Sequence, residues 1–382
     1  MTWPLIDLRT TPHGGRSLFA VQPIAQGTNI FACEAPFAHV IYKDYRREVC
    51  AQCFAYAAST SRSIDDSRTW SIRSCRATAE TVWFCTDECK VTWESGVIGP
   101  LTADVNALLG KAKIATRRNS ARDDYDPILP NGPTAQITQD YIDKAWADVE
   151  DLVSSRARLS AYCSTMNLED MELEISRSVA SAIVQRYVFD HRLASFAVSS
   201  IISTSDPWAE ILDLQSSELS NVSVRPYILA AHLRVYAFLC HSLPKHLRLY
   251  VPTARYILAR DTGNAFGIWD GDSRDEMLGW GLWAGASYFN HSCYPNVKKT
   301  RVGRTMHFTT SRSVEIGEEL CISYIDTNQT ITQRRQDLED SWFFKCRCQR
   351  CQSEEPDEAP PYRCAFLQRR SQVLDVGVCV RT

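Results

Sequence analysis

The sequence lacks the features that mark membrane, secreted and nucleic-acid-binding proteins. No apolar stretch is long enough to span a bilayer, and the first residues lack the charged-then-apolar layout of a secretory signal. There is no long run of lysine and arginine, and the net charge is only -3, so no sequence-wide attraction to nucleic acid is expected. Internal repeats are also absent. We therefore expect a protein of the nucleus or cytoplasm, without membrane segments and with no direct nucleic-acid binding evident.

Cysteine, by contrast, is abundant: the chain has 382 residues, of which 15 are cysteine. In a reducing compartment such a count favours metal ligands over disulfides. Two spaced sets stand out, a C-x2-C and C-x3-C combination at Cys50, Cys53, Cys85 and Cys89, and a tight cluster at Cys346, Cys348 and Cys351. The first set has four zinc-type ligands, whereas the second is one thiolate short of a closed tetrahedral shell. Disulfides or free thiols are the alternative.

Hydrophobic periodicity divides the chain into strand-rich ends and a helical middle. Residues 15–48 alternate apolar and polar positions around Gly27, which predicts a hairpin of short strands. From about 137 to 247 apolar residues recur at helical spacing, and 227–243 reads as a largely buried helix. Strand-like patterns return at 255–259, 305–309 and 320–324, whereas 105–135 looks loop-like and no structure is assigned to the tail after Glu355.

Three short motifs near the end of the chain carry most of the functional information. Asn-His-Ser-Cys at 290–293 is followed by Pro295 and Asn296, Gly-Glu-Glu-Leu-Cys-Ile-Ser-Tyr spans 317–324, and Cys-Arg-Cys-Gln-Arg-Cys spans 346–351. One such motif is weak evidence, but three in this order within a short region are not a chance match. The trio resembles SET-domain methyltransferases, which transfer a methyl group from S-adenosylmethionine to a protein lysine.

Methyl transfer to lysine requires alignment of the reactants and a neutral amine, and it needs no metal. Positioning alone supplies about 7–11 kcal/mol, and a narrow aromatic channel favours the uncharged form of a lysine whose unperturbed pKa is about 10.4. The resemblance implies that Tyr324 provides the catalytic hydroxyl. It also implies that the chain ending at Tyr324 threads the loop that holds Asn290 and His291, which is rare among folds. A tyrosine packed in the core is the alternative.

The same resemblance implies an S-adenosylmethionine site drawn from several segments of the chain. The expected cofactor-binding residues are Gly15, Arg16, Ser17, Asn264, Ser287, Phe289, Asn290, His291, Tyr324 and Phe344, and the expected substrate-channel residues are Phe266 and Trp342. Two positions depart from the family pattern. Ser17 replaces the second glycine of a Gly-x-Gly-Leu turn, where glycine would permit positive φ, and Trp342 replaces a channel tyrosine.

The cysteine sets also match this family. In SET domains the fourth ligand of the second cluster corresponds to Cys293, so a zinc ion would join the segment carrying Phe344 to the Asn-His loop. The first set resembles a MYND finger, which binds two zinc ions. Here Cys75 is the only further cysteine in range, and no histidine follows Cys89 where the finger would have one. The resemblance therefore implies two structural zinc ions in the whole chain, with the second site of the finger lost.

Finger and SET motifs together resemble the SET-and-MYND (SMYD) family, as a short member with a degenerate finger and no C-terminal helical-repeat domain. The implied fold is α+β: a pseudoknotted, β-rich SET domain split by a zinc-finger insert and a helical insert, with a Cys-rich post-SET zinc site. The expected segments are 1–49 and 251–328 for the SET domain, 50–95 for the finger, 96–250 for a linker and mainly helical insert, 329–353 for the post-SET segment and 354–382 for a tail.

The sequence leaves two functions open. The first is a protein-lysine N-methyltransferase, whose partner is a histone or non-histone protein or peptide carrying a lysine. The second is a non-catalytic adaptor or transcriptional regulator that uses the SET fold and the finger for protein contacts. The intact Asn290, His291 and Tyr324 favour the enzyme, whereas Ser17 and Trp342 favour the adaptor.

Overall fold

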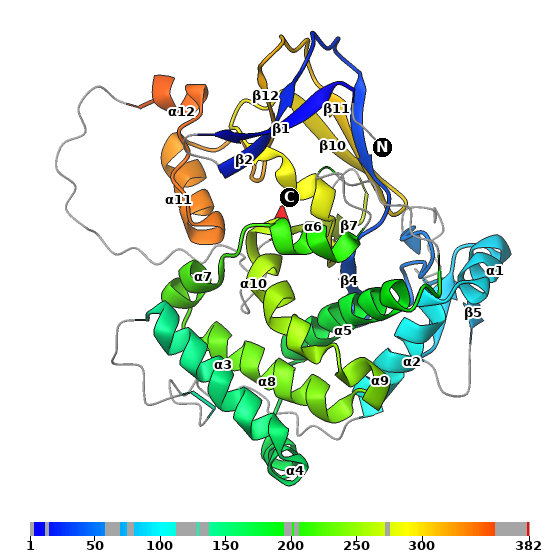
Figure 1. The fold of residues 1–382 in the computed structure, drawn as a ribbon. Helices are drawn as coiled ribbons and strands as arrows, with labels where there is room; N and C mark the ends of the chain where they lie inside the picture. The colour runs from blue at the N-terminus through cyan, green and yellow to red at the C-terminus, as the bar shows by residue number, and fades with distance from the viewer. Residues whose placement is uncertain are drawn as a thin grey trace.

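Short β-sheets form one end of the molecule and a layer of helices forms the other, with the finger at one side (Figure 1). This computed structural model describes residues 4–11, 15–57, 69–74, 80–111, 128–129, 137–194, 201, 206–271, 276–355 and 380–381. Within these ranges no helix is long and apolar enough to cross a membrane. The mixture of several small sheets with packed helices is the α+β architecture that the sequence predicts.

The first sheet brings together strands that are far apart in the chain. Its order is β1 (Ile6–Thr11), β2 (Gly15–Ala20), β12 (Glu319–Ile322) and β9 (Asn290–His291). β2 pairs antiparallel with both β1 and β12, and β12 pairs parallel with β9. The N-terminal strand carrying Arg16 therefore lies beside the strand that leads to Tyr324.

The second sheet corrects the predicted hairpin between 15 and 48. It contains β3 (Asn29–Cys33), β10 (Val297–Val302) and β11 (Thr305–Thr310), in the order β10-β11-β3. β3 pairs with β11 and makes no ladder with β2, although both strands form where the alternation predicts strands. Gly27 does have positive φ, at 81°, but the turn there joins two sheets. Long-range partners bury more apolar surface than a local hairpin, and so decide the pairing.

The third sheet has the order β13 (Val380–Arg381), β7 (Ala265–Trp269), β8 (Met277–Leu282) and β4 (Ala38–Ile41). Its outer strand β13 comes from the tail, for which the sequence predicts no structure, and it pairs parallel with the start of β7. The alternating β7 and β8 segments are almost fully buried, since helices cover one face of this sheet.

The finger and its neighbour helix lie at the side of the helical layer. The finger contains the pair β5 (Ile72–Ser74) and β6 (Val82–Phe84), followed by α1 (Asp87–Ser95). Thr86 caps α1 by accepting from the backbone N–H of Cys89. The following α2 (Ile98–Lys111) is helical where the sequence analysis predicts a loop from residue 105, because Val105 and Leu109 are buried against the main core.

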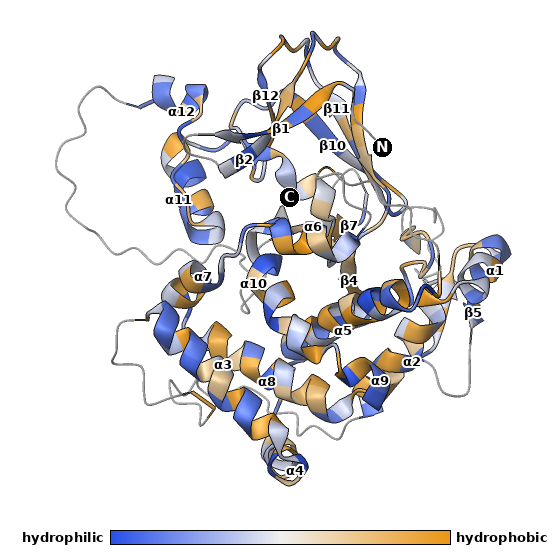
Figure 2. Ribbon diagram, viewed as in Figure 1, coloured by the Kyte–Doolittle hydropathy of each residue, from blue (hydrophilic) through white to orange (hydrophobic). Residues whose placement is uncertain are grey.

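The helical middle agrees with the prediction from periodicity. It comprises α3 (Gln139–Ser154), α4 (Arg156–Thr165), α5 (Asp170–Asp190), α6 (Pro207–Asp213), α7 (Glu218–Val224), α8 (Tyr227–Ser242), α9 (Lys245–Arg248) and η3 (Val251–Thr253). The short 3-10 helix η1 (Lys43–Tyr45) lies earlier in the chain, between β4 and the finger. Helix α8 matches the predicted span, and hydrophobic residues run along it and along α5 (Figure 2). These two helices form the centre of the layer.

Helix α10 (Ala254–Asn264) replaces the strand that the pattern at 255–259 predicts. Five alternating residues cannot distinguish a strand from a buried helix, and here Ile257 and Leu258 both pack into the core. The helix ends in an abrupt turn, with Gly263 at φ 87°, and this turn delivers Asn264 directly to the start of β7.

The segments after β12 form a small lobe beside the first sheet (Figure 1). It contains α11 (Ile331–Trp342) and α12 (Gln349–Ser353). Helix α11 ends at Phe343, which adopts the left-handed conformation with φ 62° and so turns the chain sharply after Trp342. Before this lobe, η4 (Ala284–Tyr288) leads into β9 and its Asn-His pair.

A buried acid on α10 makes stability depend on pH. Burial raises the pKa of Asp261 from its ordinary 3.8 to about 7, an increase that the nearby Trp280 indole offsets only in part. The folded chain therefore binds the proton of Asp261 more tightly than the unfolded chain does, so protonation of Asp261 stabilises the fold. This contribution is complete below about pH 4 and is lost as the pH rises to 7. Asp261→Asn should remove this part of the pH dependence, which amounts to at most about 4 kcal/mol.

Melting temperatures from pH 4 to pH 8 test this directly. The wild-type protein should lose stability relative to Asp261→Asn as the pH rises, with the largest difference above pH 7. Asp140→Asn, at an exposed position on α3, is the control and should keep the wild-type profile. Parallel pH profiles for wild type and Asp261→Asn would contradict the buried ionisation.

Candidate active site and metal centres

The Asn-His loop encloses strand β12, as the resemblance predicts for the threaded chain. Cys321 and Ile322 of β12 pair with Asn290 and His291 of β9, and the backbone N–H of Ser292 donates to the carbonyl of Ile322 at 2.9 Å. From the other side of the loop, Asn296 accepts from the backbone N–H of Cys321 at 2.8 Å. The loop is therefore held from two sides to the last residues of the strand that leads to Tyr324.

The ring of His291 connects the catalytic strand to a metal centre. Its Nδ1 accepts from the backbone N–H of Tyr324 at 3.0 Å, and its Nε2 lies 3.3 Å from the sulfur of Cys293. Accepting at Nδ1 places the ring hydrogen on Nε2, which then donates to the sulfur. Both ring nitrogens of His291, which the sequence analysis predicts to bind the cofactor, therefore have partners within the protein.

Tyr324 is buried, with 5% of its surface exposed, and its hydroxyl donates to the backbone carbonyl of Phe289 at 2.7 Å. Its ring centroid lies 5.3 Å from that of His291 and 5.5 Å from that of Trp342. The donated hydrogen bond fixes the hydroxyl hydrogen, so the remaining lone pairs of the oxygen are oriented as acceptors. The structure thus brings Tyr324 beside Trp342, the residue predicted to line the channel.

Phe344 and Trp342 enter the site from the end of α11. The ring of Phe344 lies 6.3 Å from that of His291 and is only partly buried. The indole Nε1 of Trp342 is inaccessible to water and has no hydrogen-bond partner in the described part of the chain. Across the left-handed turn at Phe343, Trp342 contacts Tyr324 and Phe344 contacts His291. Both predicted positions therefore lie next to the Asn-His loop.

Asn264 and Ser287 are joined across the site. The hydroxyl of Ser287 donates to the backbone carbonyl of Asn264 at 3.0 Å. The amide nitrogen of Asn264 donates to the carbonyls of Gln215 and Arg260, at 3.0 and 2.7 Å. Its Oδ1 makes no hydrogen bond to the described residues, so this atom is available to accept from an ammonium group.

The N-terminal strand supplies Gly15, Arg16 and Ser17. Gly15 has the positive φ, 68°, that the glycine-containing turn predicts, whereas Ser17 lies inside β2 and does not have positive φ. The expected conformational penalty at Ser17 is therefore absent. Its side chain is instead wholly buried, and its Oγ has no partner among the described residues. A buried hydroxyl without a partner is costly, so Ser17 lowers the stability of this strand in the structure described.

An acidic residue that the sequence analysis did not single out dominates the electrostatics next to Arg16. The guanidinium of Arg16 donates to the carboxylate and to the backbone carbonyl of Asp213, at the end of α6. The hydroxyl of Tyr288 donates to the same carboxylate, and Arg16 lies over the Tyr288 ring at 5.4 Å. Asp213 sits in the helical insert, far from any motif, so no local pattern could have identified it.

Two predicted site residues belong to the core. Phe266 is fully buried, against Trp283 and beneath the ammonium of Lys299, so its side chain does not line a channel. The ring of Phe289 is also fully buried and stacks on Phe308 with centroids 4.2 Å apart. Only the backbone carbonyl of Phe289 reaches the site, through Tyr324. Phe266 lies in β7, where residues 265–268 are all buried, and Phe289 lies at the junction of η4 and β9.

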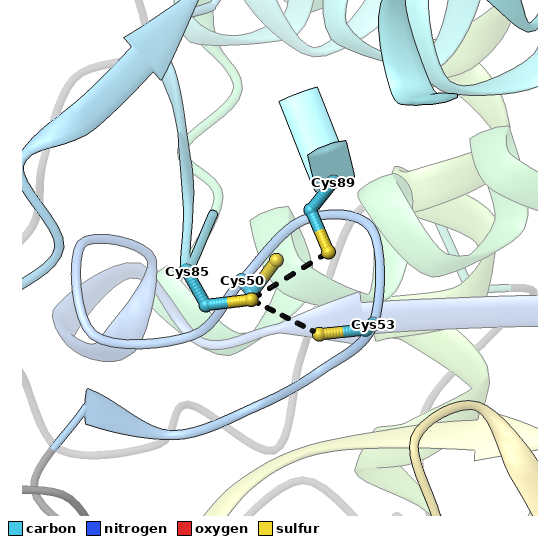
Figure 3. Close-up of side chains that lie close together, drawn as sticks. All are labelled: Cys50, Cys53, Cys85 and Cys89. Atoms are coloured by element: carbon cyan, nitrogen blue, oxygen red, sulfur yellow. Dashed lines mark hydrogen bonds between the residues drawn. The ribbon is translucent and has the colours of Figure 1, made fainter. Parts of the chain in front are cut away.

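The four finger cysteines converge on one point (Figure 3). Cys50 and Cys53 come from the loop after η1, Cys85 follows β6, and Cys89 lies in the first turn of α1. Cys85 Sγ lies 3.5 Å from both Cys53 Sγ and Cys89 Sγ. The neighbouring Cys53 thiol, helped by backbone N–H groups, lowers the pKa of Cys50 to about 5. Cys75, the other cysteine in range, lies outside the described residues.

The second cluster joins Cys293 of the Asn-His loop to three cysteines of the post-SET segment. Cys293 Sγ lies 3.5 Å from Cys351 Sγ and 4.0 Å from Cys346 Sγ, and Cys348 completes the set. Arg334, only 1% exposed, directs a guanidinium N–H to the Cys351 sulfur at 3.8 Å. This donor favours thiolate over thiol.

Both clusters fit zinc. All four sulfurs in each set lie within 4.8 Å of one another, and the described cysteines form no disulfides. A tetrahedral zinc ion with Zn–S bonds of about 2.3 Å requires sulfurs about 3.8 Å apart, which the observed 3.5–4.0 Å spacings match. Bound zinc would hold thiolates together without an open coordination position, and its role would be structural.

Comparison with known proteins agrees with the geometry. A model of the SET-domain family matches residues 15–325, and the chain therefore belongs to the SET-domain family. The "Potential protein lysine methyltransferase SET6" of Saccharomyces cerevisiae is 30% identical over 372 residues, which cover 92% of this chain and 96% of that protein.

Other relatives match more locally. A SET and MYND domain-containing protein of Dictyostelium discoideum is 37% identical over 101 residues, which make up 26% of each chain. Human histone-lysine N-methyltransferase SMYD3 is 37% identical over 94 residues, or 25% of this chain and 22% of its own length. The extended similarity is therefore to the yeast protein, and the similarity to these two relatives is confined to a quarter of the chain.

Metal content tests the two clusters. We expect two zinc ions per chain by elemental analysis, with Cys85→Ser and Cys293→Ser each losing one. Loss of the Cys293 site should lower the melting temperature and disturb Tyr324, because the His291 ring bonds to both residues. Cys240→Ser, a buried cysteine of α8 outside both clusters, should retain both ions. A single zinc ion in the wild-type protein would rule out one of the two centres.

Proposed function

We propose that this protein is an S-adenosylmethionine-dependent protein-lysine N-methyltransferase. The observation that carries the proposal is Tyr324, which is buried beside the Asn-His loop with its hydroxyl donating to the Phe289 carbonyl. This hydroxyl lies at the meeting point of β12, β9 and the end of α11. Membership of the SET-domain family supports the same reading.

The residues around Tyr324 fit S-adenosylmethionine, which supplies the methyl group as a sulfonium when bound. The partly buried ring of Phe344 provides an aromatic face for a nucleobase, and the Oδ1 of Asn264 can accept from an ammonium group. The partnerless hydroxyl of Ser17 and the guanidinium of Arg16 lie on the adjoining strand. We propose that these four residues hold the cofactor.

The protein's own groups would prepare the lysine for the reaction. A lysine side chain entering beside Tyr324 and Trp342 loses water, which disfavours its ammonium form and lowers its pKa. The Tyr324 oxygen, whose hydrogen is committed to Phe289, can accept a hydrogen bond from the remaining amine N–H and so orient its lone pair. Exclusion of water and fixed alignment, rather than acid–base chemistry by a charged residue, account for the rate enhancement we expect.

A non-catalytic adaptor remains the second candidate, and Arg16 is the observation that favours it. The guanidinium already donates to Asp213, so a cofactor carboxylate must share or displace that partner. We propose a histone or a non-histone protein as the substrate, encountered in the nucleus or the cytoplasm, and a peptide library decides between the two classes. An adaptor would bind such peptides without methylating any of them.

Cofactor binding is the first test. S-adenosylmethionine should bind the wild-type protein in isothermal titration, and Phe344→Ala should weaken binding about 5- to 150-fold, because stacking on an aromatic ring contributes about 1–3 kcal/mol. Tyr256→Ala, an aromatic residue that is 49% exposed on α10, is the matched control and should bind normally. Absence of binding by wild-type protein at millimolar cofactor would exclude the enzyme reading.

Loss of the Tyr324 hydroxyl tests the chemistry. Tyr324→Phe should reduce methyl transfer about a hundredfold or more while leaving cofactor affinity nearly unchanged, since a preorganised polar group acts mainly in the transition state. The lost hydrogen bond to Phe289 should cost about 0.5–1.5 kcal/mol of stability. Tyr236→Phe, at a buried tyrosine of α8, is the control. Equal turnover in Tyr324→Phe and wild type would show that Tyr324 is only a core residue.

A further inference from the structure

A second cavity lies away from the proposed active site, where the finger, the helical insert and the SET sheet meet. It has a volume of about 380 Å³ and is bounded by residues from β4, β6, α1, α2 and α5, together with Arg304 between β10 and β11. Its size is within the usual range for small-molecule sites. We call it the finger cavity. None of the residues proposed to hold S-adenosylmethionine lines it.

One wall of the finger cavity is apolar. Val40 of β4, Val82 of β6 and Trp93 of α1 face it together with Ile98 and Ala103 of α2. Trp93 and Ala103 belong to the separate hydrophobic cluster that packs the finger, where each is about 95% buried or more. This wall suits a hydrocarbon or aromatic group.

Two of the three arginines at the cavity are already neutralised. Arg46 pairs with both Glu80 and Glu174, and Arg177 pairs with Glu80 at 2.8 Å. These ion pairs tie the loop before the finger to α5, and their side chains are largely buried. Buried pairs of this kind need both partners. This end of the cavity therefore has no charge to offer a ligand.

Arg304 differs, because no carboxylate pairs with it among the described residues. Its guanidinium lies over the Phe54 ring at 4.3 Å, and one nitrogen donates to the backbone carbonyl of Ala51 at 3.4 Å. Burial lowers the pKa of Arg304 to about 10, and the nearby finger thiolates Cys50 and Cys53 offset only part of that effect. A cation without a paired acid at the wall of a cavity favours an anion there.

The two polar side chains beside Arg304 at the cavity, His39 and Gln185, are neutral. His39 lies close to Phe54, with ring centroids 5.2 Å apart, and burial together with Arg304 holds its pKa well below the usual value, so it is neutral. Gln185, also at the cavity, is a neutral amide that donates to the carbonyl of Pro36. The region around Arg304 therefore combines one cation that has no carboxylate partner, the nearby finger thiolates Cys50 and Cys53, neutral polar groups and an apolar wall.

We propose that the finger cavity binds a small organic monoanion with an apolar body, such as an aryl or alkyl carboxylate, whose anionic group pairs with Arg304. The carboxylate would satisfy the unpaired guanidinium, and the body would lie against Val82, Trp93 and Ile98. The ligand contacts finger, insert and SET sheet at once. This proposal does not depend on methyl transfer, because the cavity and the proposed active site share no residue.

The probes are 4-phenylbutyrate and its neutral analogue 4-phenylbutanamide, titrated into the full-length, zinc-loaded protein by calorimetry and ligand-observed NMR. The acid should bind roughly tenfold more tightly than the amide, since a hydrogen bond to a charged group contributes more than a neutral one. Arg304→Gln should abolish this preference, and Arg304→Lys should largely keep it. Arg301→Gln is the matched control: Arg301 is partly buried on the same hairpin, bonds to Trp269 and Gly303, and does not line the cavity.

A cavity-filling variant makes the test independent of charge. Thr102→Trp, on the α2 wall, should prevent binding of both probes while zinc content and S-adenosylmethionine binding stay at wild-type levels. If Arg304→Gln loses zinc, the proposal is tested by the other two variants: Arg304→Lys should keep the preference for the acid, and Thr102→Trp should bind neither probe. Equal affinity for acid and amide, unchanged binding in Thr102→Trp, or no saturable binding of the acid at millimolar concentration would each overturn the proposal.

Discussion

The rest of the candidate site depends on the contacts of one imidazole ring. His291 accepts from the backbone N–H of Tyr324 and points its other nitrogen at the sulfur of Cys293. Through these two bonds the strand that presents the proposed catalytic hydroxyl, the loop that encloses it and the post-SET metal centre become one unit. A zinc ion bound at Cys293 would therefore help to orient Tyr324 without entering the chemistry, because the His291 ring contacts both residues.

The helical insert also contacts the candidate site, through residues of α6 and α7. Glu218 of α7 accepts from Trp146 of α3 and from Arg255 of α10, which fixes the helix whose last residue is Asn264. Asp213, on the preceding α6, binds Arg16 and Tyr288. The insert thus positions Asn264, which is proposed to bind the cofactor. It also supplies the carboxylate of Asp213, which competes with the cofactor for Arg16. The affinity for S-adenosylmethionine will reflect the balance between these two effects.

Much of this could be read from the sequence, because the evidence was local. Cysteine spacing fixed the metal ligands that lie close together in the chain, and helical periodicity located α8 and the buried face of α3. The resemblance to SET domains, carried by the three motifs, implied that Asn290 lies beside the strand ending at Tyr324, and β9 and β12 do pair in parallel. In each of these cases the residues carry their own signal of chemistry or period.

Only the tertiary structure decided which strands pair, which aromatic rings are buried and which charges meet. The alternation in β2 and β3 is equally compatible with a hairpin, and their separate partners β12 and β11 come from nearly three hundred residues further along. The family resemblance predicts that Phe266 lines the channel, whereas its side chain is fully buried in the structure. Asp213 and Arg304 belong to no sequence motif. Long-range packing places Arg16 beside Asp213 and places Arg304 over the Phe54 ring without a carboxylate partner among the described residues.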